Sequence, residues 1–221
     1  MVLQDRAKAT REAIVAGAAV VFEEHGYGNA SLTQVSEAAR VTKGALYFHF
    51  QSKEDLAKAV IEEQHRIVMA HSEAILGGNQ PGLTTMILMC RAFGLQLIHE
   101  PVVKAGIRLT FEAATFGQPV RGPYEDWIAA MERLTTQGKN ERQIRSSIDP
   151  AALARYIVAS FTGVQMVSDV LTGRTDVMQR IEEMWALLLP GLMHEDFHEE
   201  PSALSRLIST GESRLKRAAL L

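Results

Sequence analysis

The sequence predicts an all-α protein, and two observations lead to this fold class. Apolar residues recur at spacings of three and four along nearly the whole chain of 221 residues, which is typical of amphipathic helices. Strict alternation of apolar and polar residues is scarce, and no Asn-Gly hairpin turn separates β-branched runs. The segments also change character near residue 52, from short helices to long apolar ones. We therefore expect domains at residues 1–52 and 53–221.

Four helices are expected in the first third of the chain, and each has a start or stop signal. Gly26 stops the first helix, and Ser31, Thr42 and Ser52 are N-cap candidates for the next three. Asp55 completes a capping-box pattern with Ser52. The expected bounds are Asp5–His25, Ser31–Ala39, Thr42–His49 and Lys53–Leu76.

Six further helices follow, and several begin at a proline, which the first helical turn tolerates. Their expected bounds are Leu83–His99, Pro101–Phe116, Pro123–Gln137, Pro150–Leu171, Thr175–Leu192 and Ser202–Leu220.

The composition is that of an ordinary globular protein, with 47% hydrophobic and 22% charged residues. The net charge of −3 argues against a generally basic nucleic-acid binder. The distribution of charge is more informative, because the stretch from Arg40 to Lys53 holds three cations and no acid.

The single cysteine, Cys90, lies in an apolar run and is expected to be a buried thiol in a reducing compartment. The N-terminus has no apolar signal-peptide core, and no apolar run approaches the roughly 20 residues of a membrane span. We expect a soluble cytoplasmic protein without a membrane partner.

The two short helices after residue 30 predict a helix-turn-helix unit packed on the first helix. Val35 and Ala38 are expected to face inward from the earlier helix, and Val41 and Leu46 from the later one. Gly44 costs about 1 kcal/mol relative to Ala inside a helix, so its presence favours close approach of the backbone to another surface.

Polar and aromatic groups on the outer side of this unit are expected to contact DNA phosphates and base edges. Phe48 and Phe50 are expected to anchor the helix to the protein. An alternative is a helical corner with solvated charges, which leaves Gly44 and the aromatic cluster unexplained. The candidate DNA-binding residues are Thr33, Thr42, Lys43, Gly44, Tyr47, His49 and Lys53.

The stretch "SLTQVSEAARVTKGALYFHFQSKEDLAKAV" resembles the DNA-binding region of the TetR family of transcriptional repressors. Within that family, "KAGIRL" and "PYEDWIAAM" are similar to the γ-butyrolactone autoregulator receptors of actinomycetes. The resemblance implies a homodimer that binds a near-palindromic operator in double-stranded DNA. It also implies that the two helices after Pro150 form the dimer interface. One departure is Arg40, which stands where the family usually has Gly in the turn.

The long helices contain candidates for a small-molecule site. Gln64 and His71 are expected on the apolar face of the helix from Lys53, and the resemblance implies a Trp over the pocket at Trp127. For each of these residues taken alone, the alternative to a ligand contact is ordinary packing in the core. We expect a mostly apolar ligand with one or two polar groups, such as a γ-butyrolactone or butenolide. The candidate ligand-binding residues are Gln64, Met89, Phe93, Trp127, Met131, Phe161, Thr162 and Gln165.

The sequence thus predicts a ligand-released repressor, not an enzyme, with no cofactor. One alternative is a receptor-like repressor that responds to antibiotics or other end products. A more remote alternative is a zinc hydrolase, because His194 to His198 match the pattern H-E-x-x-H. That motif requires both His on one stable helix and a third ligand, whereas here it lies in an acidic break between predicted helices.

Overall fold

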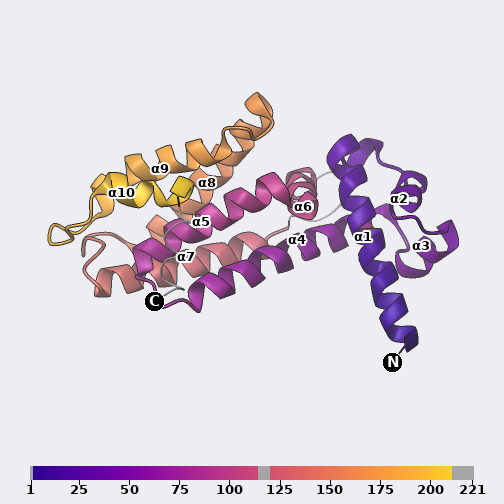
Figure 1. Cartoon of the computed structure of the whole chain (residues 1–221), viewed down its shortest axis with the longest axis horizontal. Coiled ribbons are helices and arrows are strands. Elements are labelled where there is room, and N and C mark those ends of the chain that lie inside the picture. Colours follow the sequence, from indigo (N-terminus) through magenta and orange to yellow (C-terminus); the bar gives the residue numbers. More distant parts are fainter. Residues whose placement is uncertain (1, 114–119, 211–221) are drawn as a thin grey trace. The chain divides into compact units, whose positions relative to one another are not determined.

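The computed structural model describes residues 2–113 and 120–210, and over these residues it confirms the all-α fold class (Figure 1). The described residues form ten helices and one isolated β-bridge between Ile144 and Met193. The helices are α1 (Val2–Asn29), α2 (Leu32–Ala38), α3 (Lys43–His49), α4 (Lys53–Leu76), α5 (Gly82–His99), α6 (Pro101–Glu112), α7 (Gly122–Asn140), α8 (Pro150–Thr172), α9 (Val177–Leu192) and α10 (Pro201–Ser205).

The helices form two compact units, each with its own interior. The first comprises Met1–Ala70 and His99–Val120, and the second His71–Ile98 and Arg121–Leu221. Helix α6 therefore packs with the N-terminal helices, although it follows α5 in sequence. The expected domain limits at residues 1–52 and 53–221 remain a proposal about which segments carry which function.

The predicted helix starts are confirmed by side-chain caps in the first unit. Ser31 Oγ accepts from the Gln34 amide, and Gln34 Oε1 accepts in return from the Ser31 amide, which makes a reciprocal capping box. Thr42 Oγ1 accepts from the Ala45 amide at 3.1 Å. Short helices are marginal alone, so these caps fix where α2 and α3 begin while packing on α1 holds them.

The core of the first unit contains the predicted stripe of α1, with Ile14, Ala18 and Phe22 fully buried. The expectation that Ala38 faces inward is wrong, because Ala38 is exposed. The close approach occurs one residue later, where a Cβ on Gly17 would lie 2.8 Å from Ala39 Cβ. Helix α2 therefore crosses α1 at a glycine of α1.

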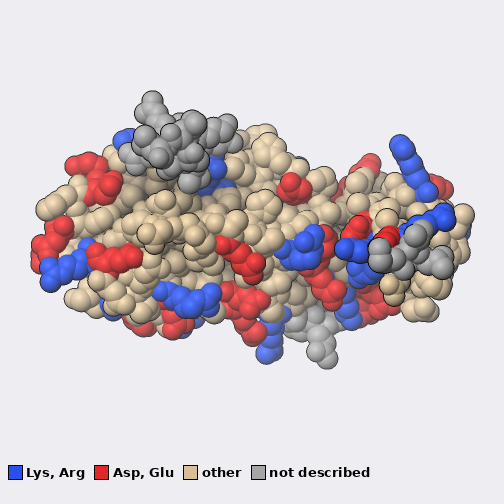
Figure 2. Space-filling model, turned by 60° about the horizontal axis from the view of Figure 1, so that its bottom comes forward, with Lys and Arg blue, Asp and Glu red and all other residues tan. Residues whose placement is uncertain are grey.

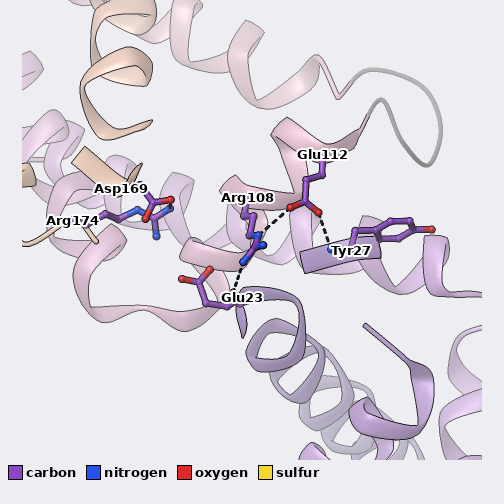
Figure 3. A network of polar contacts seen from close by, with 6 residues as sticks. All are labelled: Glu23, Tyr27, Arg108, Glu112, Asp169 and Arg174. Carbon is purple, nitrogen blue, oxygen red and sulfur yellow. Dashed lines mark hydrogen bonds and ion pairs between the residues drawn. The ribbon is translucent and has the colours of Figure 1, made fainter. Parts of the chain in front are cut away.

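Helix α1 is longer than expected and continues past Gly26 to Asn29. Gly26 still interrupts it, with non-helical angles of φ 71° and ψ 171°. At this break, Arg108 of α6 donates to the Glu23 carbonyl and to Glu112 Oε1, and Glu112 Oε2 accepts from the Tyr27 amide (Figure 3). Arg108 and Glu112 of α6 thus bind backbone groups on both sides of the break.

Helix α6 also packs closely against α4. A Cβ on Gly106 would lie 2.7 Å from Gln64 Cγ, so only glycine permits this contact. The expected end of α6 at Phe116 lies outside the described residues, and the helix is described to Glu112.

The second unit has α5 as its most buried helix, with Met86, Ile87 and Leu97 fully enclosed. Among the described helices, α5 has the length and apolarity of a membrane span, contrary to expectation, but 67% of it is buried inside the protein, as in a core helix. Cys90 is buried as expected, and burial raises the pKa of its thiol to about 12.

The hairpin of α8 and α9 turns at two left-handed residues, Gly173 and Arg174. Asp176 holds this turn, because it accepts from Ser168 Oγ, Thr172 Oγ1 and Arg180 Nε. The last helix differs from the expectation of one helix over Ser202–Leu220: α10 ends at Ser205, a turn follows at Arg206, and residues 207–210 are again helical. Residues 211–221 lie outside the described ranges.

Candidate nucleic-acid interface and effector site

Helix α3 presents most of the candidate DNA-binding residues to solvent. Thr42, Lys43, Gly44 and Tyr47 are exposed, as is Thr33 of α2, and His49 is half-buried. A Cβ on Gly44 would meet nothing within 4 Å except Thr42 Oγ1 at 3.9 Å, so no packing within the protein requires this glycine. The backbone of α3 is therefore open to another molecule at Gly44.

Of the two phenylalanines expected to anchor α3, Phe50 is buried and Phe48 is exposed. Phe50 is buried and anchors the end of the helix, with the Arg11 guanidinium 5.3 Å from its ring centre. Phe48 is 78% exposed and packs edge-on against His49, so the expectation that it anchors the helix is wrong. Phe48 lies two residues after buried Leu46, a rotation of about 200° around the helix, so it faces away from the core.

Lys53 is occupied by the protein itself. Its ammonium donates to the carbonyls of Tyr27, Gly28 and Ala30 at 2.7–3.2 Å, and it lies 4.5 Å from the Tyr27 ring centre. An ammonium has three hydrogens, so all its donors are used. This geometry favours a structural role, namely holding the end of α1 against the start of α4, over the expected DNA contact.

Arg40 adopts the left-handed conformation that the turn requires, with φ 54°. A non-glycine residue there costs roughly 1–2 kcal/mol. Its side chain is exposed beside α3. On the face shown in Figure 2, basic and acidic side chains are interspersed, in keeping with the net charge of −3. This face therefore offers a polyanion no broad basic surface.

The second unit contains a buried aromatic cluster formed by three helices. Phe93 of α5 lies 5.1 Å from Trp127 of α7 and 5.2 Å from Phe161 of α8, measured between ring centres. Trp127 and Phe161 are 6.2 Å apart and nearly parallel. The structure thus brings together three of the expected ligand-binding residues in one buried aromatic cluster.

Other expected ligand-binding residues also lie within this unit. Met89 and Met131 are buried, and Thr162 is half-buried. Gln165 is 3% exposed, and its Oε1 has no hydrogen-bond partner among the described residues. Sequence analysis missed Gln96 of α5, which is 6% exposed with Nε2 likewise unpartnered. An unpaired buried amide group costs about 1–3 kcal/mol, so these atoms suit a polar partner.

Gln64 belongs to the first unit, where its side chain is 3% exposed and its Oε1 has no partner in the described part of the chain. This burial agrees with its expected place on the inner face of α4. His71 is exposed, so the expectation that it shares that face is wrong. The apolar stripe of α4 has turned away from His71 by the seventh residue after Gln64.

The outer face of the α8–α9 hairpin is apolar and open. It borders a groove of about 550 Å³ that includes Val164, Met184 and Leu188. Such large exposed apolar patches mark protein-protein contacts. Its most exposed members are Tyr156, Met166, Val167, Val170, Leu171 and Leu187.

The pattern from His194 to His198 does not form a helical zinc motif. These residues follow the end of α9 as a turn, and His194 Nδ1 accepts from the Asp196 amide at 3.1 Å. Within residues 2–113 and 120–210, no three His, Cys, Asp or Glu side chains gather as a metal site. The geometry that a helical H-E-x-x-H requires is therefore missing at His194 and His198.

Comparison with known proteins found two family models that match this chain. Residues 14–60 match the family model of bacterial regulatory proteins of the tetR family, and residues 82–194 match the tetracyclin repressor-like C-terminal domain. The chain is 36% identical to the A-factor receptor protein of Streptomyces griseus over 98% of its own length and 76% of that protein.

Two solved structures are also similar. One is a gamma-butyrolactone receptor, 28% identical, with a TM-score of 0.78 over 93% of this chain and 99% of that one. The other is CprB of Streptomyces coelicolor in complex with its operator, 29% identical, with a TM-score of 0.76 over 95% and 99%. The chain belongs to the TetR family of bacterial transcriptional regulators.

Proposed function

We propose that this protein is a cytoplasmic repressor that binds a near-palindromic operator as a homodimer and is released by a small diffusible ligand. The observation that carries the proposal is the pairing of an open α3 with a buried aromatic cluster in the other unit. The first suits contact with DNA and the second suits a mostly apolar ligand.

At the operator, α3 enters the major groove with its N-terminus first. Lys43 contacts a base edge or phosphate, while Thr33, Thr42, Tyr47 and His49 bind phosphates. Gly44 permits close approach of the helix backbone. Phe48 joins this surface because it is exposed beside Tyr47. Lys53 acts indirectly by fixing the first turn of α4.

The dimer forms through the outer faces of α8 and α9, which carry the exposed apolar side chains described above. Two copies of such a hairpin make a four-helix bundle across a two-fold axis, a common arrangement for homodimers. Two recognition helices related by that axis suit an operator with two similar half-sites.

The ligand binds against Phe93, Trp127 and Phe161, with Met89, Met131 and Thr162 around them and Gln165 as a polar contact. The names of the relatives support a γ-butyrolactone or a related lactone as its class. Gln64 lies buried in the first unit on α4, the helix that begins at the DNA-binding segment. To empty the operator, the ligand must favour the DNA-incompetent state by several kcal/mol.

The proposal is tested with the purified protein and the DNA upstream of its own gene. Fluorescence anisotropy should show salt-dependent binding, and added γ-butyrolactones should release the DNA. Failure to retain any DNA at low salt would contradict the repressor function. Release by antibiotics but by no lactone would favour a receptor-like repressor of end products.

A further inference from the structure

We propose that Phe48 contacts the 5-methyl group of a pyrimidine in the major groove, so that operator affinity depends on a methyl at one base position in each half-site. The inference rests on the proposed function, because it names a specificity-determining residue within the operator contact of α3. It goes beyond that function by assigning one side chain to one chemical group of the DNA.

The Phe48 ring is available to another molecule. Among the described aromatic side chains it is the most exposed, at 78%. It packs edge-on against His49, with 5.1 Å between the ring centres, and this contact leaves most of the ring in water. Leu46 and Phe50 are buried and hold α3 against the core, so the fold does not depend on Phe48.

Phe48 lies at the centre of the face that α3 turns away from the core. Successive residues of a helix are rotated by about 100°, so Gly44 and Phe48 are about 40° apart and lie opposite buried Leu46. Lys43 and Tyr47 lie to one side of this line, about 60–100° from Gly44. With α3 in the major groove, Phe48 therefore faces the floor of bases, whereas Lys43 and Tyr47 lie nearer a phosphate wall.

Gly44 allows this face to approach the bases closely. A Cβ at Gly44 would meet only Thr42 Oγ1, at 3.9 Å, so the protein does not cover the backbone at this point. Phe48 follows one helical turn later, about 6 Å further along the axis. Because base pairs are stacked about 3.4 Å apart, the ring reaches a base about two steps from the one that Gly44 faces. Phe48 therefore has a defined position within each half-site.

The phenyl ring of Phe48 selects the chemistry of the base. It has no hydrogen-bond donor or acceptor, so it cannot bind a phosphate or the polar edge of a base. The floor of the major groove presents one apolar group, the 5-methyl of thymine, whereas cytosine has only a hydrogen at C5. 5-Methylcytosine carries the same methyl in the same position. Phe48 therefore favours a 5-methylpyrimidine, which is thymine in DNA without modified bases.

Deoxyuridine scanning tests the contact, because deoxyuridine is thymidine without the methyl group. Each thymine of the operator from the upstream DNA is replaced in turn, in both half-sites, and dissociation constants are measured by fluorescence anisotropy. Burying one methyl is worth about fourfold in affinity, so replacement at one position in both half-sites should weaken binding about 15-fold. Phe48→Ala should bind the thymine operator more weakly and show no further loss at that position.

Two control variants locate the effect on Phe48 itself. Tyr47→Ala removes the neighbouring exposed ring, and it should keep the loss at the same deoxyuridine position although its overall affinity falls. Val20→Ala shortens a 49% exposed apolar side chain of α1 in the same unit, and it should keep both the affinity and the scanning pattern. Phe48→Ala should have nearly the melting temperature of the unmodified protein, because it removes an exposed ring.

A second probe separates the methyl group from the rest of thymine. At the position found by scanning, the A·T pair is replaced by G·C, with either cytosine or 5-methylcytosine. The unmodified protein should bind the methylated operator about fourfold more tightly for each half-site changed. Phe48→Ala should not distinguish the two operators.

Several outcomes would overturn the assignment while leaving the repressor intact. One is an operator in which no thymine responds to removal of its methyl. Another is an equal response in Phe48→Ala, or a response that disappears in Tyr47→Ala, since a different side chain would then contact the methyl. Equal binding of cytosine and 5-methylcytosine would also overturn it. If the unmodified protein retains no operator at low salt, the repressor function is contradicted, and the assignment with it.

Discussion

The recognition helix α3 and the aromatic cluster place their important side chains in opposite environments. In α3 the candidate contacts are exposed, and buried Leu46 and Phe50 only hold the helix in place. In the second unit, the candidate ligand residues are themselves part of the core. A substitution in α3 can therefore alter binding with little effect on stability, whereas a substitution in the cluster alters both. Experiments on the cluster need stability controls that experiments on α3 do not.

The largest effect is expected for Trp127→Ala. Truncating a buried Trp costs about 3–5 kcal/mol of unfolding free energy, and here it also removes one of the three rings of the cluster. Release of operator by a lactone should be lost, while operator binding at low temperature should persist. Trp185→Ala is the control, since Trp185 is fully buried in α9 and makes no ring contact with the described aromatic cluster. If Trp127→Ala and Trp185→Ala lose operator release to the same extent, Trp127 contributes only to stability and not to ligand binding.

Arg108→Ala tests a contact of the first unit that is neither fully exposed nor part of the core. It leaves the Glu23 carbonyl and the Glu112 carboxylate without this partner beside the break in α1, so the unfolding free energy should fall by about 1–3 kcal/mol. Operator affinity should fall as well, because α1 supports α2 and α3. Arg66→Ala removes an exposed pair with Glu63 in the same unit and should cost no more than about 1 kcal/mol. Denaturant titration measures both unfolding free energies. If Arg108→Ala and Arg66→Ala lose the same amount, the contacts at the break in α1 have no special role in stability.

Lys43→Ala should change DNA binding without changing stability. If Lys43 contacts a base, operator affinity falls by about 1–3 kcal/mol; if it contacts a phosphate, affinity falls for all sequences and the salt dependence weakens by about one unit of slope. Lys58→Ala removes an exposed lysine of α4 that pairs with Glu54. This variant should leave the operator affinity and its salt dependence unchanged. Unaltered affinity in Lys43→Ala would remove this residue from the interface.

Gly44→Ala should affect stability and DNA binding in opposite directions. Ala favours a helix by about 1 kcal/mol over Gly, and nothing in the protein obstructs the new methyl, so the melting temperature should rise. Operator affinity should fall if the backbone approaches DNA closely. Gly106→Ala is the contrasting variant, since its methyl meets Gln64 and should destabilise the protein by about 1–3 kcal/mol. A gain in both stability and affinity for Gly44→Ala would contradict close approach.

Local sequence signals predicted the helix-turn-helix well, because caps act within three residues. Ser31, Thr42 and Ser52 each bind an amide three residues ahead, and their types and spacing are visible in the sequence. The orientation of Phe48 was predicted wrongly, since four consecutive aromatic or His side chains contain no signal for which one faces the core.

The interior of the second unit was only partly predictable for a different reason. Apolar spacing placed Phe93, Trp127 and Phe161 on buried faces, and the family resemblance singled out Trp127. Gln96 could not be recognised, because an apolar helix with one glutamine does not show whether another segment supplies a partner for it. The role of Lys53 was hidden likewise, since its carbonyl partners lie more than twenty residues earlier in sequence.

The smallest effect is expected at the turn between α8 and α9, under the proposed dimer face. Hydrogen bonds from Ser168, and also from Thr172 and Arg180, lower the pKa of Asp176 to about 2 from an ordinary value of 3.8. Because the folded-state pKa is the lower one, the stabilisation is fully present above about pH 4 and is lost as the pH falls through 2. Asp176→Asn should therefore lower the melting temperature at pH 6, and the difference from the unmodified protein should shrink as the pH falls. Asp5→Asn, an exposed change on α1, should show no such trend. If the difference in melting temperature between Asp176→Asn and the unmodified protein is the same at pH 6 and at pH 2.5, the charge of the carboxylate does not stabilise the turn.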